Sequence, residues 1–263
     1  MSSPSALSRK RVQVCSSALP GEDYPWSPPE PVVRATMVQR WALLTFLHWP
    51  LPPDRVACLL PAGLELDVFE GSAWVGLIPF RLTVRAPRMP AVPWASTTPE
   101  INLRTYVRGA DGRVGIWFLS LEAARLGAVL LARTWYRLPY LWADTRLDVA
   151  GDRIRYRTRR RWPALRRPSA EIDVAPGDRI PRGRASALER FLLARWRLYS
   201  PLTEGLAATQ VHHGVWPLHR AELLRFEQQD LLRAAGLPEP EGVPLVHFSP
   251  GVETRFGPRR RVL

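Results

Sequence analysis

The hydrophobic positions along the chain fall into short runs, alternating or continuous, that are bounded by turn-forming residues. Runs of this length and spacing predict β-strands joined by turns. The expected strands are residues 64–69, 73–84, 101–107, 114–123, 143–149, 153–162, 205–216, 221–227, 244–250 and 252–256. The sequence Gly-Ala-Asp-Gly at 109–112 predicts a hairpin between two of them.

A few segments carry helical signals instead. The predicted helices cover residues 52–63, 122–136, 186–200 and 229–236. In the second, Leu126, Leu130 and Leu131 form part of an apolar stripe. In the third, Ser186 and Glu189 have the spacing of a capping box ahead of an apolar face. We therefore expect a predominantly antiparallel β domain of the α+β class with a few short helices.

Domain organisation follows from where the periodicity starts. Residues 1–35 are rich in Ser and Pro and lack apolar periodicity, so we expect a flexible leader. Residues 36–263 contain no internal repeat and no interdomain linker, so they form one expected domain. The 46% hydrophobic content, with 11 Trp, is enough for a real core, and 27 Pro and 17 Gly suit many short strands.

The strand at 99–107 separates its side chains by character. Because successive strand residues point to opposite faces, one face carries Glu100, Asn102, Arg104 and Tyr106. The other carries Ile101, Leu103, Thr105 and Val107. The pattern alone favours water beside the polar face, because antiparallel sheets commonly expose one side. A lined cavity that holds a ligand is the alternative.

The net charge of +13 raises the question of nucleic acid. Of the 37 basic residues, 36 are arginine and one is Lys10, which is typical of an Arg-favouring genome as much as of a binding surface. The segment 153–167 holds eight arginines and no acid, and its alternation predicts one cationic strand face. A solvated or edge strand explains that face. No nucleic-acid-binding motif accompanies it, so we regard nucleic acid as an unlikely partner.

Targeting and redox signals are weak. The basic residues 9–11 are followed by a segment too short and polar for a signal peptide. The longest apolar run, 126–132, is far shorter than the roughly 20 residues that span a bilayer. Cys15 and Cys58 have no metal or redox spacing. We expect a cytoplasmic protein without a membrane partner.

Motifs for common chemistries are also missing. The five histidines lie outside every zinc-binding spacing, and His212 and His213 are adjacent, so at most one could face a given site in a strand. There is no G-x-S-x-G elbow, no P-loop and no G-x-G-x-x-G. We expect no metal and no cofactor.

Four ordered segments carry a resemblance that runs from about Val38 to the C-terminus. They are residues 40–80, "PEINLRTYV" at 99–107, residues 115–140, and "QVHHGVWPL" at 210–218. Together they resemble the YqjF-like family of uncharacterised bacterial proteins, whose fold is similar to that of acetoacetate decarboxylase. The resemblance implies a curved, mostly antiparallel sheet that closes into a β-barrel cone around a pocket. It also implies that the polar face at 99–107 turns inward, with Glu100 at the position of a glutamate that lines the decarboxylase site.

One departure bears on the chemistry. Acetoacetate decarboxylase forms a Schiff base through a lysine, in a region that resembles residues 133–142 here. That region has no lysine, and Lys10 in the leader is the only lysine of the chain. Arginine cannot take its place because it stays protonated. We therefore expect no Schiff-base decarboxylation.

Two main hypotheses remain. The first is a small-molecule pocket protein, for an organic acid or another small metabolite. The expected ligand-binding residues are Glu100, Asn102, Arg104, Trp117, Trp135, Tyr136 and Tyr140, with a buried Glu100–Arg104 pair among them. The second is a lysine-independent enzyme with Glu100 as general base and Tyr136 or His212 as general acid. A nonspecific nucleic-acid binder is a distant third, and a homo-oligomer is an open alternative to a monomer.

Overall fold

A computed structural model describes residues 14–15, 24–91, 96–126, 133, 137–163, 167–181 and 183–263. The described strands are β1 (Val14–Cys15), β2 (Met37–Leu51), β3 (Leu64–Phe69), β4 (Ser72–Arg85), β5 (Thr97–Gly109), β6 (Val114–Ala123), β7 (Tyr140–Ala150), β8 (Arg153–Trp162), β9 (Ser169–Arg179), β10 (Arg197–Pro201), β11 (Leu206–His213), β12 (His219–Gln229) and β13 (Leu245–Arg261). The described helices are α1 (Pro53–Ala57), α3 (Ala187–Leu193) and the 3-10 turn η2 (Arg233–Ala235). The expected β-rich, mostly antiparallel α+β fold is confirmed.

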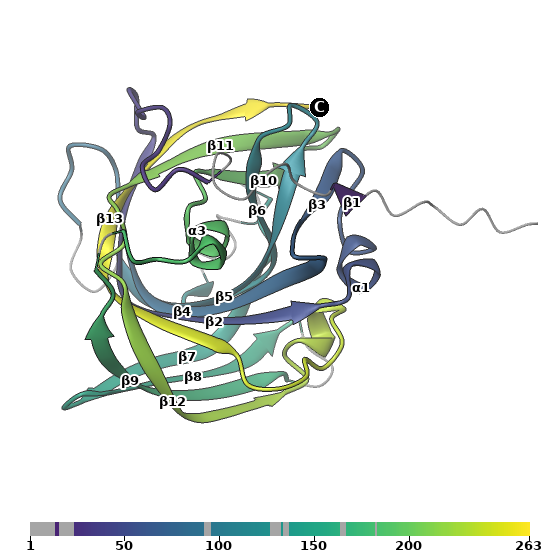
Figure 1. Cartoon of the computed structure of the whole chain (residues 1–263). Helices are drawn as coiled ribbons and strands as arrows, with labels where there is room; N and C mark the ends of the chain where they lie inside the picture. Colours follow the sequence, from purple (N-terminus) through teal and green to yellow (C-terminus); the bar gives the residue numbers. More distant parts are fainter. Residues whose placement is uncertain are drawn as a thin grey trace, which may run out of the picture.

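Seven of these strands form a closed ring. Their order is β5-β4-β2-β13-β11-β10-β6, and pairing between β5 and β6 closes it. Figure 1 looks into this ring, with α3 at its centre. A closed ring of strands leaves few free edges and creates an interior that side chains must fill or line.

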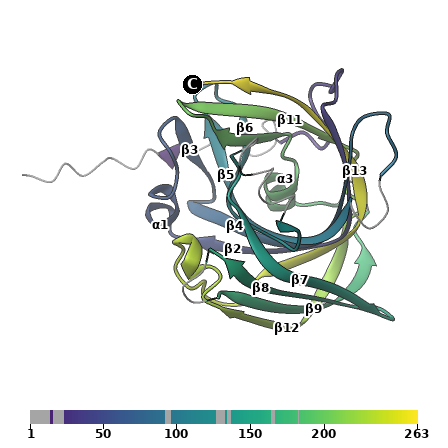
Figure 2. The ribbon, with the colours of Figure 1, turned by 180° about the vertical axis from the view of Figure 1, so that it is seen from behind.

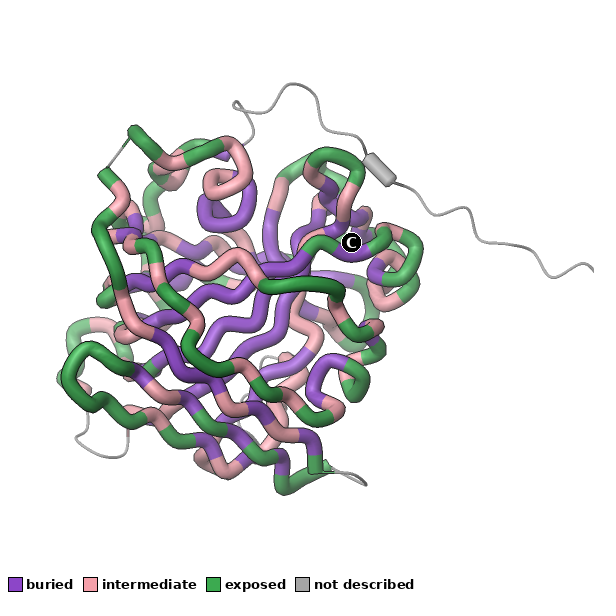
Figure 3. Tube along the Cα trace, turned by 60° about the horizontal axis from the view of Figure 1, so that its bottom comes forward, coloured by how far each residue is buried: buried purple, intermediate pink, exposed green. Residues whose placement is uncertain are grey.

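The remaining long strands form an outer layer. β7, β8, β9 and β12 lie side by side beneath the ring and connect to it through β6–β7 and β12–β13 pairs. The same arrangement is visible from behind in Figure 2. The main apolar core lies between this layer and the outer face of the ring, with Leu47, Leu77 and Ile101 on one side and Tyr156 and Ile172 on the other. In Figure 3, buried and exposed residues alternate along the layer, as expected for strands with one solvated face.

A bulge in β2 decides which of its side chains face the ring interior. The pairing register between β2 and β4 shifts between Ala42 and Leu47, and Leu43 has a φ of 52°. A bulge of this kind reverses the alternation beyond it. Odd positions such as Trp41 therefore face inward before the bulge, and even positions such as Phe46 face inward after it.

Helix α3 closes one part of the interior. The Ser186 hydroxyl accepts from the Glu189 amide at 3.1 Å, and the Glu189 carboxylate accepts from the Ser186 amide at 2.6 Å. The capping box read from the sequence is thus confirmed. Phe191, Leu192 and Leu193 are buried in the second apolar core, inside the ring.

Several sequence expectations need correction. The helix expected at 186–200 ends at Leu193, and Arg197–Pro201 is strand β10, because these residues pair with β11 and β6. The two strands expected at 244–256 are one strand, β13, which continues through Gly251. The helix expected at 229–236 is a 3-10 turn. Most of the helix expected at 122–136 lies outside the described residues.

The N-terminal segment also differs from expectation where it is described. Tyr24 is buried, and its hydroxyl donates to the Asp67 carboxylate at 3.0 Å. The Trp196 indole donates to the Pro25 carbonyl at 2.8 Å. Residues 24–35 therefore include core contacts, which a flexible leader would lack; apolar periodicity could not reveal them because single residues make them.

The arginine-rich strand β8 is neither an edge strand nor a free cationic face. It lies between β7 and β9. Its arginines are largely paired: Arg155 with Asp173 at 2.7 Å, Arg157 with Asp148 at 2.6 Å, Arg160 with Glu122 at 2.5 Å and Arg161 with Asp144 at 3.1 Å. The acids come from neighbouring strands, which the local sequence could not show.

Within the described part of the chain, no helix combines the length and the apolar character that crossing a membrane requires.

Candidate functional site

The interior of the ring holds a cavity of about 400 Å³. Its walls come from β2, β4, β5, β6, β11 and β13, with residues that follow α3 and β11. Aromatic side chains supply much of this wall: Trp41, Phe46, Phe80, Phe118, Trp216 and Phe256. A largely apolar cavity with a few polar groups is the usual form of a small-molecule site.

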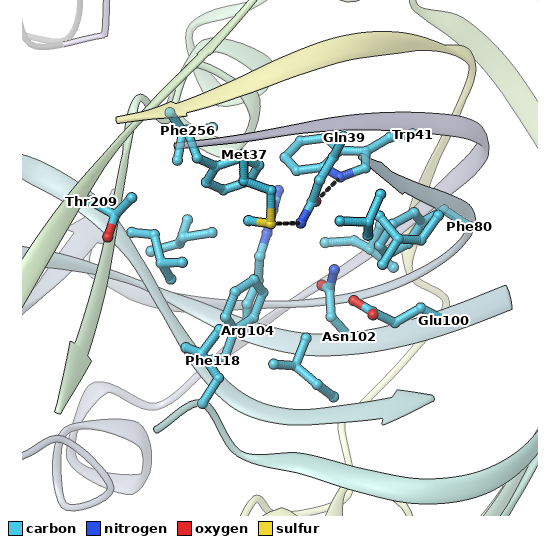
Figure 4. A pocket seen from close by; sticks show the side chains of 18 of the residues that line it. Met37, Gln39, Trp41, Phe80, Glu100, Asn102, Arg104, Phe118, Thr209 and Phe256 are labelled. Atoms are coloured by element: carbon cyan, nitrogen blue, oxygen red, sulfur yellow. Dashed lines mark hydrogen bonds between the residues drawn. The ribbon is translucent and has the colours of Figure 1, made fainter. Parts of the chain in front are cut away.

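The polar face of β5 is turned into this cavity. Glu100, Asn102 and Arg104 all line it and are all buried. Figure 4 shows them projecting from one strand toward Gln39 and Trp41 on the opposite wall. The pattern alone favoured a face exposed to bulk solvent. That prediction is wrong, because the ring turns this face toward its interior.

Glu100 has a tyrosine as its partner. The Tyr140 hydroxyl donates to Glu100 Oε2 at 3.0 Å. Burial raises the pKa of the Glu100 carboxyl to about 8, against a smaller lowering by the Tyr140 hydrogen bond. Glu100 is therefore mostly a neutral acid at neutral pH. The expected Glu100–Arg104 ion pair is absent among the described contacts; the alternation of one strand does not bring the two side-chain ends together.

Arg104 is a buried cation without a carboxylate partner in the described structure. Its residue is 8% exposed. Its hydrogen bond, from Nη2 to the Leu192 carbonyl, is long at 3.5 Å, and its Nε is buried without a partner. The guanidinium also lies 5.7 Å from the Tyr106 ring centre. Beside it, the Asn102 Oδ1 atom is buried and accepts no hydrogen bond.

Arg195 lines the same cavity but, unlike Arg104, has a carboxylate partner. Its Nη1 donates to Asp67 Oδ2 at 2.6 Å, and its Nε donates to the Phe191 carbonyl at 2.6 Å. Its guanidinium packs against the rings of Tyr24, Tyr106 and Phe191 at 4.4–4.7 Å. The charge of Arg195 is therefore balanced by Asp67, and that of Arg104 is not.

The Tyr106 hydroxyl contacts a buried histidine, His48. The Tyr106 hydroxyl lies 2.7 Å from His48 Nε2. Burial, with a smaller contribution from the Arg104 charge, holds the pKa of His48 well below its ordinary value. His48 is therefore neutral, and its Nε2 can accept a hydrogen bond from the Tyr106 hydroxyl.

His213 lies on the wall among three tryptophans. Its ring centre is 4.4 Å from that of Trp216, 4.6 Å from Trp196 and 6.0 Å from Trp41. Its Nδ1 lies 2.7 Å from the Gly214 carbonyl, so Nδ1 carries the proton and Nε2 keeps a lone pair. Burial lowers the pKa of His213 to about 4, so the ring is neutral.

The remaining predicted residues divide. Tyr140 lines the cavity. His212 does not, because Val211 and His213 occupy the inward positions of β11. One histidine of the adjacent pair does face the cavity, but it is His213 and not the predicted His212. Trp117 packs outside the ring against the small cluster around Tyr199, since its neighbours Ile116 and Phe118 face inward. The predicted Trp135 and Tyr136 lie outside the described residues.

Sequence reasoning missed Arg195, His213 and Trp41. Trp41 faces inward only because of the β2 bulge, and Arg195 reaches the cavity from just beyond α3. For His213, the period-two pattern of Val211 with His213 was an available signal. In the described part of the chain, no group of three side chains that could hold a metal ion gathers.

The site offers three distinct chemical functions. Arg104 can bind an anion, neutral Glu100 can donate a proton, and His213 Nε2 can accept a hydrogen bond. Aromatic side chains form much of the wall around them.

Comparisons with known proteins give a family and a fold. A family model, DUF2071, described as an uncharacterized conserved protein, matches residues 38–253. The "Uncharacterized protein YqjF" of Bacillus subtilis (strain 168) is 36% identical over 232 residues, which cover 86% of this chain and 92% of that protein.

Three of the solved structures that resemble the chain are enzymes that share little sequence identity with it. An acetoacetate decarboxylase-like enzyme from Sphingomonas wittichii RW1 has a TM-score of 0.61 at 13% identity, covering 89% of this chain and 96% of its own. The enduracididine biosynthesis enzyme MppR, complexed with pyruvate, has a TM-score of 0.62 at 11% identity, covering 89% and 93%. Acetoacetate decarboxylase from Legionella pneumophila has a TM-score of 0.58 at 17% identity, covering 95% and 98%. These identities show a common fold.

Proposed function

The chain belongs to the DUF2071 family of YqjF-like proteins and has the fold of acetoacetate decarboxylase, and from this we propose that it binds a small carboxylic acid inside the strand ring. The observation that carries the proposal is the buried Arg104 guanidinium without a carboxylate partner among the described residues. Burying a charge costs several kcal/mol unless something offsets it. A ligand carboxylate that accepts two hydrogen bonds from the planar fork is the natural partner.

The rest of the site supports an acid as ligand. Because Glu100 is neutral, it does not repel a carboxylate. The fold neighbour MppR is complexed with pyruvate, which is itself a carboxylic acid. The nucleic-acid alternative has no such support, since four of the arginines of β8 are paired with acids.

Covalent capture of the ligand as a Schiff base has no support. The only lysine of the chain is Lys10, and residues 138 and 140, which line the cavity, are Leu and Tyr. Acetoacetate decarboxylation through a lysine is therefore not expected. Robust decarboxylation of acetoacetate by the purified chain would contradict this.

The test of binding is to identify what the protein retains. We expect mass spectrometry of the gently purified full chain to detect a co-purifying carboxylic acid. Arg104→Gln should lose it, and the exposed Arg153→Gln on β8 should keep it. Failure of added carboxylic acids to raise the melting temperature of ligand-free protein would refute the proposal, because a ligand at 100 times its Kd stabilises by about 2.7 kcal/mol.

A second candidate function is a lysine-independent acid–base enzyme, for which Glu100 and His213 are the specific observation. Here Glu100 is the acid rather than the base, because its pKa is raised to about 8. His213, in place of His212, is the base through its Nε2 lone pair, and it is a weak base because burial lowers its pKa to about 4. Exchange of the α-protons of a bound acid with D₂O, followed by NMR, tests this. Exchange that survives in His213→Gln would rule out His213 as the base.

A further inference from the structure

The cavity is larger and more apolar than recognition of a very small acid requires. Its volume of about 400 Å³ compares with about 30 Å³ for each water molecule in the liquid, so it equals roughly a dozen waters. Pyruvate has six non-hydrogen atoms, so even at about 30 Å³ for each atom it would fill less than half of that space. The remaining wall would stay in contact with poorly bound water.

The wall around the polar face of β5 is largely apolar. Phe80 and Phe118 lie near the polar face of β5, and Trp41 stacks on Trp216 at 6.0 Å with an angle of 13°. Ile78, Leu82 and Val211 fill the spaces between the aromatic rings. Tyr140 donates to Glu100, and Arg195 donates to Asp67 and to the Phe191 carbonyl. The buried lining atoms without a hydrogen-bond partner are Arg104 Nε, Asn102 Oδ1 and Arg195 Nη2 among the described residues.

Of the buried arginines that line the cavity, Arg104 has no carboxylate partner in the described structure, so it can bind one negative group of a ligand. Arg195 is balanced by Asp67, and Glu100 is uncharged near neutral pH. Arg125 and Arg259 also line the cavity, but both are only half-buried, so water can solvate their charges. Arg104 thus supplies the anion site of the buried interior.

We propose that the ligand of this cavity is a hydrophobic monocarboxylic acid with a tail the length of a medium-chain or phenyl-substituted acid. Its carboxylate binds the Arg104 fork, with the Asn102 amide beside it, and its tail lies against Phe80, Phe118 and Trp41. The inference rests on the proposed function and adds its ligand class. It separates this site from one that takes pyruvate or acetoacetate.

The predicted affinity follows tail length. Each methylene that leaves water for an apolar wall contributes about 0.8 kcal/mol, which is an affinity gain of roughly fourfold. The gain should continue along the straight-chain series from butanoate upward and stop once the cavity is full. A second negative charge at the far end of the ligand should cost at least tenfold in affinity, because Arg195, the other buried cation of the lining, is already paired with Asp67.

The experiment is isothermal titration calorimetry of the full ligand-free chain. The titrants are pyruvate, acetoacetate, butanoate, hexanoate, octanoate, 3-phenylpropionate, octanedioate and octan-1-ol. We expect octanoate and 3-phenylpropionate to bind at least 30-fold more tightly than pyruvate, and octanedioate and octanol to bind at least tenfold more weakly than octanoate. Arg104→Gln should lose the preference for octanoate over octanol.

Two further results separate the inference from the function beneath it. Phe80→Ala, which enlarges the tail region, should move the best chain length upward while still preferring acids over octanol. Pyruvate or octanedioate binding as tightly as octanoate, with dependence on Arg104, would overturn the hydrophobic ligand class and leave the proposed function standing. Absence of binding by every acid would overturn both.

Discussion

Replacing Arg104 by Met separates a binding role from a stabilising one. The change removes the guanidinium and keeps a side chain of similar length in an apolar position. If Arg104 serves only to bind ligand, its buried charge lowers the free energy of unfolding of the ligand-free protein. Arg104→Met should therefore be more stable than the parent and should lose binding of carboxylic acids.

The magnitude follows from what Arg104 gains and loses. Burying one charge costs several kcal/mol after relaxation. Against this stand a cation–π contact at 5.7 Å, worth about 0.5–1 kcal/mol, and one hydrogen bond at 3.5 Å, the outer limit of such bonds. We expect Arg104→Met to raise the free energy of unfolding by about 1–3 kcal/mol. For a chain of this size that is a rise in Tm of roughly 2–10 °C.

Arg195→Met is the matched control, because the same residue type lines the same cavity. Its removal leaves the fully buried Asp67 carboxylate without its strongest partner. The expected loss is about 3–5 kcal/mol, nearer the lower figure because Arg108 remains 3.5 Å from Asp67. The assay is urea unfolding of the ligand-free proteins followed by circular dichroism. Equal destabilisation by both substitutions would refute the view that Arg104 lacks a structural partner.

Three smaller predictions test other parts of the structure. Because burial raises the pKa of Glu100 to about 8, the folded state holds a proton that the unfolded state releases, so stability falls as pH rises from about 5 to about 8; urea unfolding across that range should show a shallower fall for Glu100→Gln. Tyr24→Phe should cost about 1–3 kcal/mol in the same assay, because it removes a donor from buried Asp67, and no measurable loss would restore the view of a contact-free leader. Ser186→Ala should cost about 1 kcal/mol through the lost cap of α3, and Ser186→Thr should recover most of it in thermal unfolding.

The strands could be predicted from the sequence where the local pattern of apolar and polar residues determines them. Residues 64–69 and 114–123 have the same limits in the sequence reading and in the structure. Long-range pairing decided the failures. Residues 197–201 continue a helical pattern, yet strands β6 and β11 offer them backbone partners on both sides. Tertiary pairing of this kind overrides local propensity.

The candidate site was predictable to the extent that alternation along one strand determines it. Glu100, Asn102 and Arg104 share a face in the sequence and line one cavity in the structure. Their partners were not predictable. Tyr140 reaches Glu100 through a parallel pairing of β7 with β6, and Asp67 neutralises Arg195 from 128 positions away. A wrong partner reverses the energetic expectation, since the assumed Glu100–Arg104 pair would have made Arg104 stabilising.

The loss of the lysine and the apolar wall belong to one argument about affinity. A Schiff base can hold a very small acid by a covalent bond, and this chain lacks that means outside Lys10. Arg104 is already buried in the ligand-free chain, so pairing with a ligand carboxylate favours an acid over a neutral ligand. The carboxylate still loses its own hydration, so the pair alone does not supply high affinity. High affinity then depends on apolar area, and the cavity provides it through the Phe and Trp residues of its wall. A ligand held in this way must carry its own hydrophobic surface, whatever happens to it afterwards.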